Sequence, residues 1–316
     1  MLQAERRAGH GSAAVFWSRL GRDLLVHKYL YLMVLPMVIW YLVFCYVPMY
    51  GVLMAFQNYN PRMGIIGSEW VGFAHFISFF GSNYFVRLIR NTLLISLYDL
   101  FWGFPAPILF ALLLNELRGK YFKKAVQTVS YIPYFISLMV ICGLLKSFCS
   151  SGGLFNDIRE LFGATRIDLL ARPELFRTLY VSSGIWQHIG FNSIIYIAAL
   201  TNIDPGLYEA ATIDGAGKYK QVWHITLPGI LPTIMILLIL RVGSLMSVGY
   251  EKIILLYSSV TYETADVIST FVYRKGILDA NYSYSAAIGL FNSVINFVLL
   301  IGTNWLSRRT TENSLW

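Results

Sequence analysis

The side chains best able to do chemistry are few in this chain and are not grouped for catalysis. The histidines show no spacing that suits a metal site, and they are His10, His27, His75, His188 and His224. Cys45, Cys142 and Cys149 fall in or beside apolar runs, where cysteine usually acts as a small buried apolar residue. There is no G-x-x-x-x-G-K-[ST] loop to hold phosphates. We therefore expect no catalytic residue, no metal site and no cofactor bound by this chain itself.

Asp99 and Arg241 are charged residues set well inside apolar runs. If these runs cross a membrane, Asp99 lies about 12 Å from one end of its run and Arg241 about 22 Å from the opposite end. These depths are similar in a hydrocarbon core of about 30 Å. The sequence thus predicts an intramembrane ion pair between them. The alternative is that Asp99 faces a wet cavity while Arg241 extends its guanidinium to the interface.

The composition is that of a membrane protein. The chain has 316 residues, of which 56% are hydrophobic and 13% charged, and its mean hydropathy is +0.57. Soluble domains are usually about a quarter charged. A net charge of +8 would also suit nucleic acid, but basic residues beside membrane spans account for it. Membrane lipid is therefore an expected partner and nucleic acid is not.

Six apolar runs are long enough to cross a bilayer as helices. They cover residues 29–55, 91–116, 130–149, 178–201, 226–249 and 284–306. The sequence thus predicts an all-α, polytopic membrane protein with a six-helix domain over residues 29–306 and tails at 1–28 and 307–316. In the first tail Phe16, Leu20 and Leu24 recur at helical spacing, which suits either a helix on the membrane surface or an ordinary tail.

The distribution of basic residues predicts the orientation of these spans. Lysine and arginine are denser in the short segments 1–28, 118–124, 201–225 and 308–309 than in the longer loops between them, although the bias is modest. By the positive-inside rule, both termini and the segment 201–225 lie in the cytoplasm. We therefore expect a multi-pass protein of the cell membrane.

Segment 204–228 has the turn chemistry of a short helical hairpin. Asp204 and Pro205 suit the N-cap and first turn of a helix that runs to Ile213. Gly215 supplies a positive φ that ends this helix. A second short helix is predicted over 218–225, before Leu227 and Pro228 open the next span. Without further information this hairpin is either a simple connector or a lever that moves two spans together.

The residues of this hairpin resemble the EAA loop of ABC importer permeases. The match covers Glu209, Ala210, Ala211, Asp214, Gly215, Ala216, Leu227 and Pro228, and it lies between the fourth and fifth of six spans. The resemblance implies a type I ABC importer permease fold, in which this loop couples to a cytoplasmic ATPase. The chain would then be a bacterial membrane permease without its own ATPase site, and ATP and Mg would be bound by the partner.

Other segments resemble the larger of the two paired permeases of complex-carbohydrate importers. These are residues 262–274, 286–291, 71–73 and 314–316. This resemblance implies import of an oligosaccharide through a heterodimeric permease. The implied partners are a second permease subunit, two cytoplasmic ATPase subunits and an extracellular or periplasmic solute-binding protein. A small solute such as an amino acid or peptide is the alternative cargo.

Polar and aromatic residues within the spans are candidates for the sugar path, because sugars bind planar amides and aromatic faces. The candidates are Tyr134, Trp186, Gln187, Asn192, Asn292 and Asn296. Asn292 and Asn296 are four residues apart and so share one helix face. Equally, such amides often hold membrane helices together. A secondary transporter or a membrane-embedded enzyme would need an ion site in inverted repeats, or catalytic groups, and neither pattern is seen.

Overall fold

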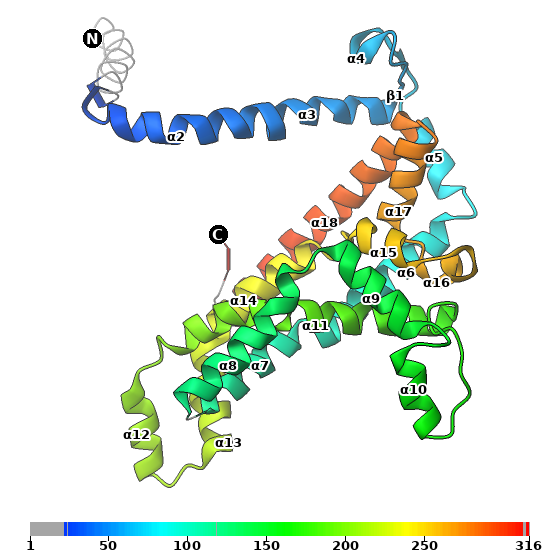
Figure 1. Ribbon diagram of the computed structural model, residues 1–316. Coiled ribbons are helices and arrows are strands. Elements are labelled where there is room, and N and C mark those ends of the chain that lie inside the picture. Colours follow the sequence, from blue (N-terminus) through cyan, green and yellow to red (C-terminus); the bar gives the residue numbers. More distant parts are fainter. Residues whose placement is uncertain (1–21, 24, 118, 312–313, 316) are drawn as a thin grey trace, which may run out of the picture. The chain divides into compact units, whose positions relative to one another are not determined.

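A computed structural model describes residues 22–23, 25–117, 119–311 and 314–315 (Figure 1). The predicted surface helix around Phe16, Leu20 and Leu24 lies outside these residues. The chain divides into two units, residues 1–54 and 55–316. In the described parts it is almost wholly helical. Two short strands, β1 (Gln57–Asn58) and β2 (Glu69–Trp70), pair antiparallel, with Gln57 opposite Trp70.

From Lys28 onward, the described part of the first unit is one long apolar helical run. Its segments are α2 (Lys28–Tyr41), a π-helical turn η2 (Leu42–Tyr46), α3 (Val47–Met49) and a 3-10 turn η3 (Tyr50–Phe56), the last of which reaches into the second unit. No residue of α2, η2 or α3 is buried. An apolar helix with no buried side chain is stable only where lipid or another subunit covers it.

The second unit contains the packed helices. Its first half comprises α4 (Gly64–Gly67), α5 (Ala74–Phe80), α6 (Phe85–Tyr98), the π-helical turn η4 (Asp99–Gly103), α7 (Pro105–Glu116), α8 (Lys120–Tyr131), the 3-10 turn η5 (Ile132–Phe135), α9 (Leu138–Cys149) and α10 (Leu154–Leu161). Its second half comprises α11 (Pro173–Leu200), α12 (Pro205–Ile213), α13 (Lys218–Gln221), η6 (Val222–Thr226), α14 (Leu227–Gly243), α15 (Tyr250–Leu256), η7 (Ser259–Thr261), α16 (Tyr262–Ala265), α17 (Ile268–Tyr273), η8 (Arg274–Leu278) and α18 (Tyr282–Thr311).

Helix α11 is central to this unit. It packs most extensively against α7 and also contacts α6, α8, α14 and α16. At Gly190 it meets the end of α8 so closely that a Cβ would lie 2.3 Å from the carbonyl oxygen of Ser130. Only glycine permits this approach of two backbones. Helix α11 thus joins two of the apolar clusters, one around Phe176 and one around Tyr196.

Five helices in the described chain are long and apolar enough to cross a membrane. They run from Lys28 to Phe56, Phe85 to Glu116, Leu138 to Leu161, Lys218 to Gly243 and Tyr282 to Arg309. Helix α11, with 28 residues, is not among these five but is of comparable length. It carries polar side chains such as Ser183, Gln187 and Ser193 that are buried against other helices. Together these helices are consistent with the expected six-span arrangement.

The helices of the structure have other bounds than several of the predicted spans, and the second and fourth begin earlier than expected, at Phe85 and Pro173. The span predicted over 130–149 is not one helix, because Pro133 ends α8 and Ser137 caps a new helix, α9, by accepting a hydrogen bond from the N–H of Val140. The span predicted over 226–249 ends at Gly243. In the other direction the helix runs from Lys218 into α14 without interruption. The sixth helix continues to Thr311, beyond the predicted 306.

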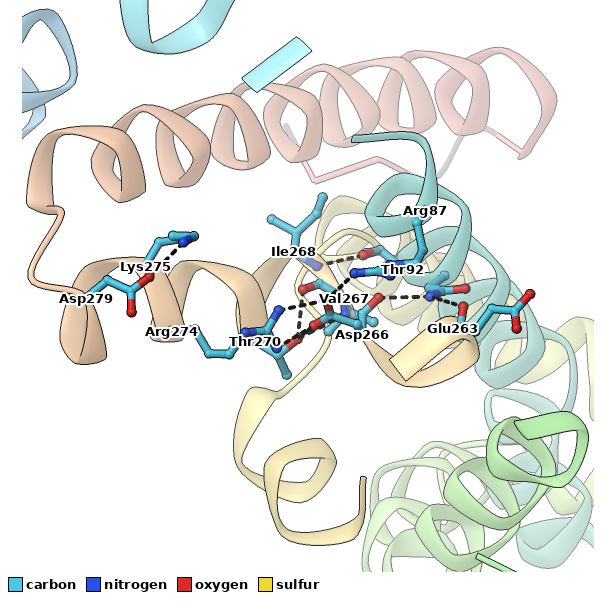
Figure 2. A network of polar contacts seen from close by, with 11 residues as sticks. Arg87, Thr92, Glu263, Asp266, Val267, Ile268, Thr270, Arg274, Lys275 and Asp279 are labelled. Carbon is cyan, nitrogen blue, oxygen red and sulfur yellow. Dashed lines mark hydrogen bonds and ion pairs between the residues drawn. The ribbon is translucent and has the colours of Figure 1, made fainter. Parts of the chain in front are cut away.

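A buried carboxylate, Asp266, lies at the centre of a polar network that holds several helices together (Figure 2). Its side chain is 0% exposed. Arg274 donates to both carboxylate oxygens, at 2.8 and 2.7 Å. Arg87 of α6 donates to one of them at 3.3 Å, and Thr270 to the other at 2.7 Å. Four donors match the acceptor capacity of a carboxylate, so this charge is fully paired inside the fold.

Two neighbours of Arg87 on α6 extend the network. The amide nitrogen of Asn91 donates to the carbonyl oxygens of Glu263 and Asp266, at 2.9 and 3.0 Å. Its amide oxygen accepts from Arg177 of α11 at 2.8 Å. The hydroxyl of Thr92 accepts from the N–H of Ile268 at 3.1 Å. The network therefore ties α6 and α11 to the short helices α16 and α17.

Replacing Asp266 by asparagine should destabilise the protein strongly, because two guanidinium groups would be left facing each other without an anion. Removing one partner of a buried ion pair typically costs about 3–5 kcal/mol. The matched control is Asp279→Asn, which breaks an exposed pair with Lys275 and should cost well under about 1 kcal/mol. Thermal unfolding of the purified membrane protein measures both, and equal shifts for the two variants would contradict this role of Asp266.

Candidate functional site

The main cavity of the second unit is the one with charged side chains in its lining, and it has a volume of about 550 Å³. A more apolar hollow beside Leu97, Trp102 and Ile185 is larger. Its walls come from α6 and η4, from α11, from α14 and the bend that follows it, and from α15. On α11 the lining residues Tyr180, Gly184, His188 and Asn192 are spaced four apart, so they form one stripe along the helix. The cavity is therefore lined by a stripe along α11 that carries an imidazole and an amide, and the other walls add the charged groups of Asp99, Arg241 and Lys252.

Asp99 and Arg241 both line this cavity and contact each other as an ion pair. Asp99 begins the π-helical turn η4, in which the N–H of Phe104 donates to its carbonyl oxygen at 3.1 Å. A Cβ at Gly103 would collide with the carboxylate of Asp99, so glycine leaves room for that side chain. The sequence predicted both residues at similar depth, and the structure brings them together. Any part they play in transport stays a prediction.

Lys252 is a second cation in the cavity wall. Its place there could not be predicted from the sequence, because it falls between two predicted spans. It is 8% exposed. Its ammonium donates to the carbonyl oxygen of Tyr180 at 3.0 Å and lies 4.8 Å from the centre of the Tyr180 ring. Burial lowers the pKa of this ammonium to about 8.

The six residues predicted to line a path do not gather at one place. Only Asn192 lines the main cavity. Trp186 lines a separate apolar hollow between α8 and α11. Tyr134 stacks on Phe191, with ring centres 3.8 Å apart, so one of its faces is occupied. Gln187 and Asn292 each hold a buried side-chain oxygen without a hydrogen-bond partner among the described residues.

Asn296 of α18 fastens the bend that follows α14. Its amide oxygen accepts from the N–H of Met246 at 2.9 Å, and its nitrogen donates to the hydroxyl of Ser247 at 2.8 Å. These bonds account for both ends of the amide. In this structure Asn296 therefore holds α18 to the bend after α14. This agrees with the alternative interpretation from the sequence, in which such amides hold membrane helices together.

The hairpin 204–228 has the form that its sequence predicts, and Figure 1 shows its arms α12 and α13 projecting away from the packed helices. The carboxylate of Asp204 accepts from the N–H of Gly206 at 2.9 Å. Gly215 has φ +73°, and the N–H groups of Gly215 and Ala216 donate to the carbonyl oxygens of Thr212 and Ala211. This pair of hydrogen bonds is a Schellman cap, which closes a helix rigidly.

Further contacts brace the two arms of the hairpin against each other. The amide nitrogen of Gln221 donates to the hydroxyl of Thr212 and the carbonyl oxygen of Ala216, at 3.0 and 3.2 Å. The hydroxyls of Tyr208 and Thr226 are 3.0 Å apart. The predicted second helix over 218–225 is not a separate short helix, because α13 continues through the π-helical turn η6 into α14.

The outer surface of the hairpin is unusually apolar for a projecting segment. Leu207, Ile213, Tyr219 and Trp223 are all more than half exposed. Helix α12 has no buried residue, and Glu209 and Ala210 are exposed while Ala211 is partly covered. An exposed apolar surface on a rigid hairpin is typical of a protein docking site.

Comparison with known proteins identifies the family. The family model described as "Binding-protein-dependent transport system inner membrane component" matches residues 103–312. The chain is 43% identical, over all of both chains, to the Polygalacturonan/rhamnogalacturonan transport system permease protein YteP of Bacillus subtilis. It is 40% identical to the Protein LplB of the same organism, over 97% of this chain and 95% of the relative.

Solved structures agree with this assignment. A chain from the crystal structure of "a bacterial ABC transporter involved in the import of the acidic polysaccharide alginate" has a TM-score of 0.86 and 46% identity, over 93% of this chain and 99% of the other. A second structure of an alginate ABC transporter, in complex with an "alginate pentasaccharide-bound periplasmic protein", has a TM-score of 0.87. The chain therefore belongs to the binding-protein-dependent transport system inner membrane components, the permease subunits of ABC importers.

Proposed function

We propose that this chain is the permease subunit of an importer for uronate-containing oligosaccharides. The observation that carries the proposal is the identity along the full chain to relatives named for polygalacturonan and for the acidic polysaccharide alginate. Both names denote polymers that carry carboxylates. The main cavity is consistent with an acidic cargo, because its lining holds Arg241 and Lys252 against the single carboxylate of Asp99.

Import requires partners, because this chain has no phosphate-binding loop. A second permease completes the membrane domain, and two cytoplasmic ATPase subunits bind ATP and Mg. A solute-binding protein delivers the oligosaccharide, in line with the solved alginate transporter that is bound to a periplasmic protein carrying an alginate pentasaccharide. The chain itself contributes no catalytic group. The relatives described above offer no support for the alternative of an amino acid or peptide cargo.

The hairpin 204–228 is the proposed connection to the ATPase. Its caps and cross-bonds make it rigid, and its apolar surface is free to dock. Closure of the ATPase subunits on ATP would then move the hairpin as one body and carry α14 with it. The cavity would open alternately to the two sides of the membrane, which is a coupling between two distant sites. In this arrangement the hairpin and both termini are cytoplasmic.

The cargo is tested by uptake in proteoliposomes containing both permeases, the ATPase and the binding protein. Labelled oligosaccharides of galacturonate and of mannuronate should be taken up in an ATP-dependent manner, whereas neutral arabino- and malto-oligosaccharides of equal length should not. Uptake of only the neutral sugars, or uptake without ATP, would refute the proposed function.

The turn at Gly215 should be essential for coupling. A β-branched residue is strained at φ +73°, and a left-handed conformation costs a residue with a Cβ about 1–2 kcal/mol. Gly215→Val should therefore lower sugar-stimulated ATP hydrolysis roughly 5- to 30-fold while the complex still assembles. Gly217→Val is the matched control, because Gly217 has an ordinary φ of −69° and open space around its Cβ position. Full coupling in Gly215→Val would remove the hairpin from the mechanism.

The contact between Asp99 and Arg241 should matter for transport. Asp99→Arg and Arg241→Asp should each reduce uptake about tenfold, because each leaves two like charges together. The double variant restores opposite charges and should recover most of the activity. The same exchange at the exposed pair of Lys275 and Asp279 should change uptake little. If the double variant is as inactive as the single variants, the ion pair is not needed as such.

A further inference from the structure

Lys252 is a buried cation to which the described chain offers no anion. Several arginines within the second unit do have one, since Arg87 and Arg274 share Asp266 and Arg241 contacts Asp99. An ammonium has three N–H donors. In the described part of the structure only one of them has a partner, the carbonyl oxygen of Tyr180. Two donors are therefore available for a further acceptor.

Keeping such a charge inside the fold is costly. Burial of an ammonium without a counter-ion disfavours the charged form, and the contacts with one carbonyl and one aromatic ring compensate only part of this cost. A side chain that served merely to pin α15 to α11 would not need a charge. A charged group kept at this position is a candidate for contact with a ligand.

The surroundings of the ammonium are open toward the cavity. Gly184 lies beside it, and a Cβ at that position would come within 3.5 Å of the Lys252 nitrogen. The absence of a side chain there leaves the ammonium uncovered on the side of the polar stripe. Further along the same stripe His188 and Asn192 add an imidazole and an amide. These groups suit the hydroxyls of a sugar, whereas the ammonium suits an anion.

We infer that Lys252 binds a carboxylate of the oligosaccharide as it passes through the cavity, and that it thereby selects acidic over neutral sugars. The inference rests on the proposed function, since it assigns one contact within that transport path. A single ammonium with two available N–H groups matches a singly charged carboxylate, which forms short charge-assisted hydrogen bonds with such donors. Arg241, on another wall of the cavity, already contacts the carboxylate of Asp99. Lys252 has no such carboxylate partner among the described residues, so an anionic cargo can supply its counter-ion.

The test compares an acidic sugar with its neutral counterpart in the complete importer. Uptake of trigalacturonate and of its methyl ester is measured with saturating loaded binding protein, so that the affinity of the binding protein does not enter. Lys252→Gln removes the charge, Lys252→Arg keeps it, and Lys146→Gln is the matched control, because Lys146 is exposed and outside the cavity lining. If Lys252→Gln does not assemble, Lys252→Met replaces it as an apolar chain of similar length.

Lys252→Gln should reduce uptake of trigalacturonate about tenfold, which is the scale of one lost charge-assisted hydrogen bond. Uptake of the methyl ester should stay within about twofold, and Lys252→Arg and Lys146→Gln should leave uptake of the acid nearly unchanged. Should the wild-type importer not accept the ester, the dissociation constant of free trigalacturonate for the complex without binding protein is measured instead. In that case Lys252→Gln should raise it about tenfold and Lys146→Gln should not.

Three outcomes separate the inference from the function on which it rests. Equal losses for the acid and the ester would show that Lys252 only holds α15 in place, and no change for either sugar would show that the cargo does not meet it. Both results overturn the inference while leaving the importer function intact. Failure of the wild-type complex to take up or bind trigalacturonate would instead refute the proposed cargo.

Discussion

The pairing of Asp266 with two arginines is the constraint on which the packed unit depends. A fully buried carboxylate is tolerable only when its charge and all its acceptor positions are satisfied. Here the donors come from α6, α17 and η8. These segments therefore cannot separate without leaving a buried charge unpaired. Val267 and Ile268, next in the chain, belong to two different apolar clusters. The ion network therefore fixes how those clusters meet.

The cavity also contains charged side chains, but there the pairing of charges is incomplete. The carboxylate of Asp266 is fully paired and the helices around it are held in place. In the cavity, Asp99 and Arg241 balance each other, but Lys252 is left with unused donors. Asp266 thus has its bonds made within the fold, whereas Lys252 has donors left for the proposed cargo. Residue type alone does not make this distinction, as the two ends of the Asn296 amide illustrate.

Features set by neighbouring residues could be read from the sequence, whereas most of those set by distant contacts could not. The pair of Asp99 and Arg241 is an exception, because the similar depth of two charges in apolar runs is itself visible in the sequence. The hairpin was predictable because its cap at Asp204 and its turn at Gly215 are local. Span ends were less accurate where a local signal broke an apolar run, as at Pro133. Trp186 and Asn192 lie on one helix but line different hollows. The burial of Lys252 depends on Tyr180, which is 72 residues away in the chain.

The hydrogen bonds of Asn296 have a mechanical consequence. Without these hydrogen bonds, the bend after Gly243 would be flexible, and a movement of α14 would not be passed on beyond it. Because Asn296 binds Met246 and Ser247, the bend after α14 is held against α18. Met246 in turn packs with Ile268 and Phe271, next to the Asp266 network. If the hairpin moves as proposed, the helix from Lys218 to Gly243, about 39 Å long, would therefore connect that movement to the Asp266 network.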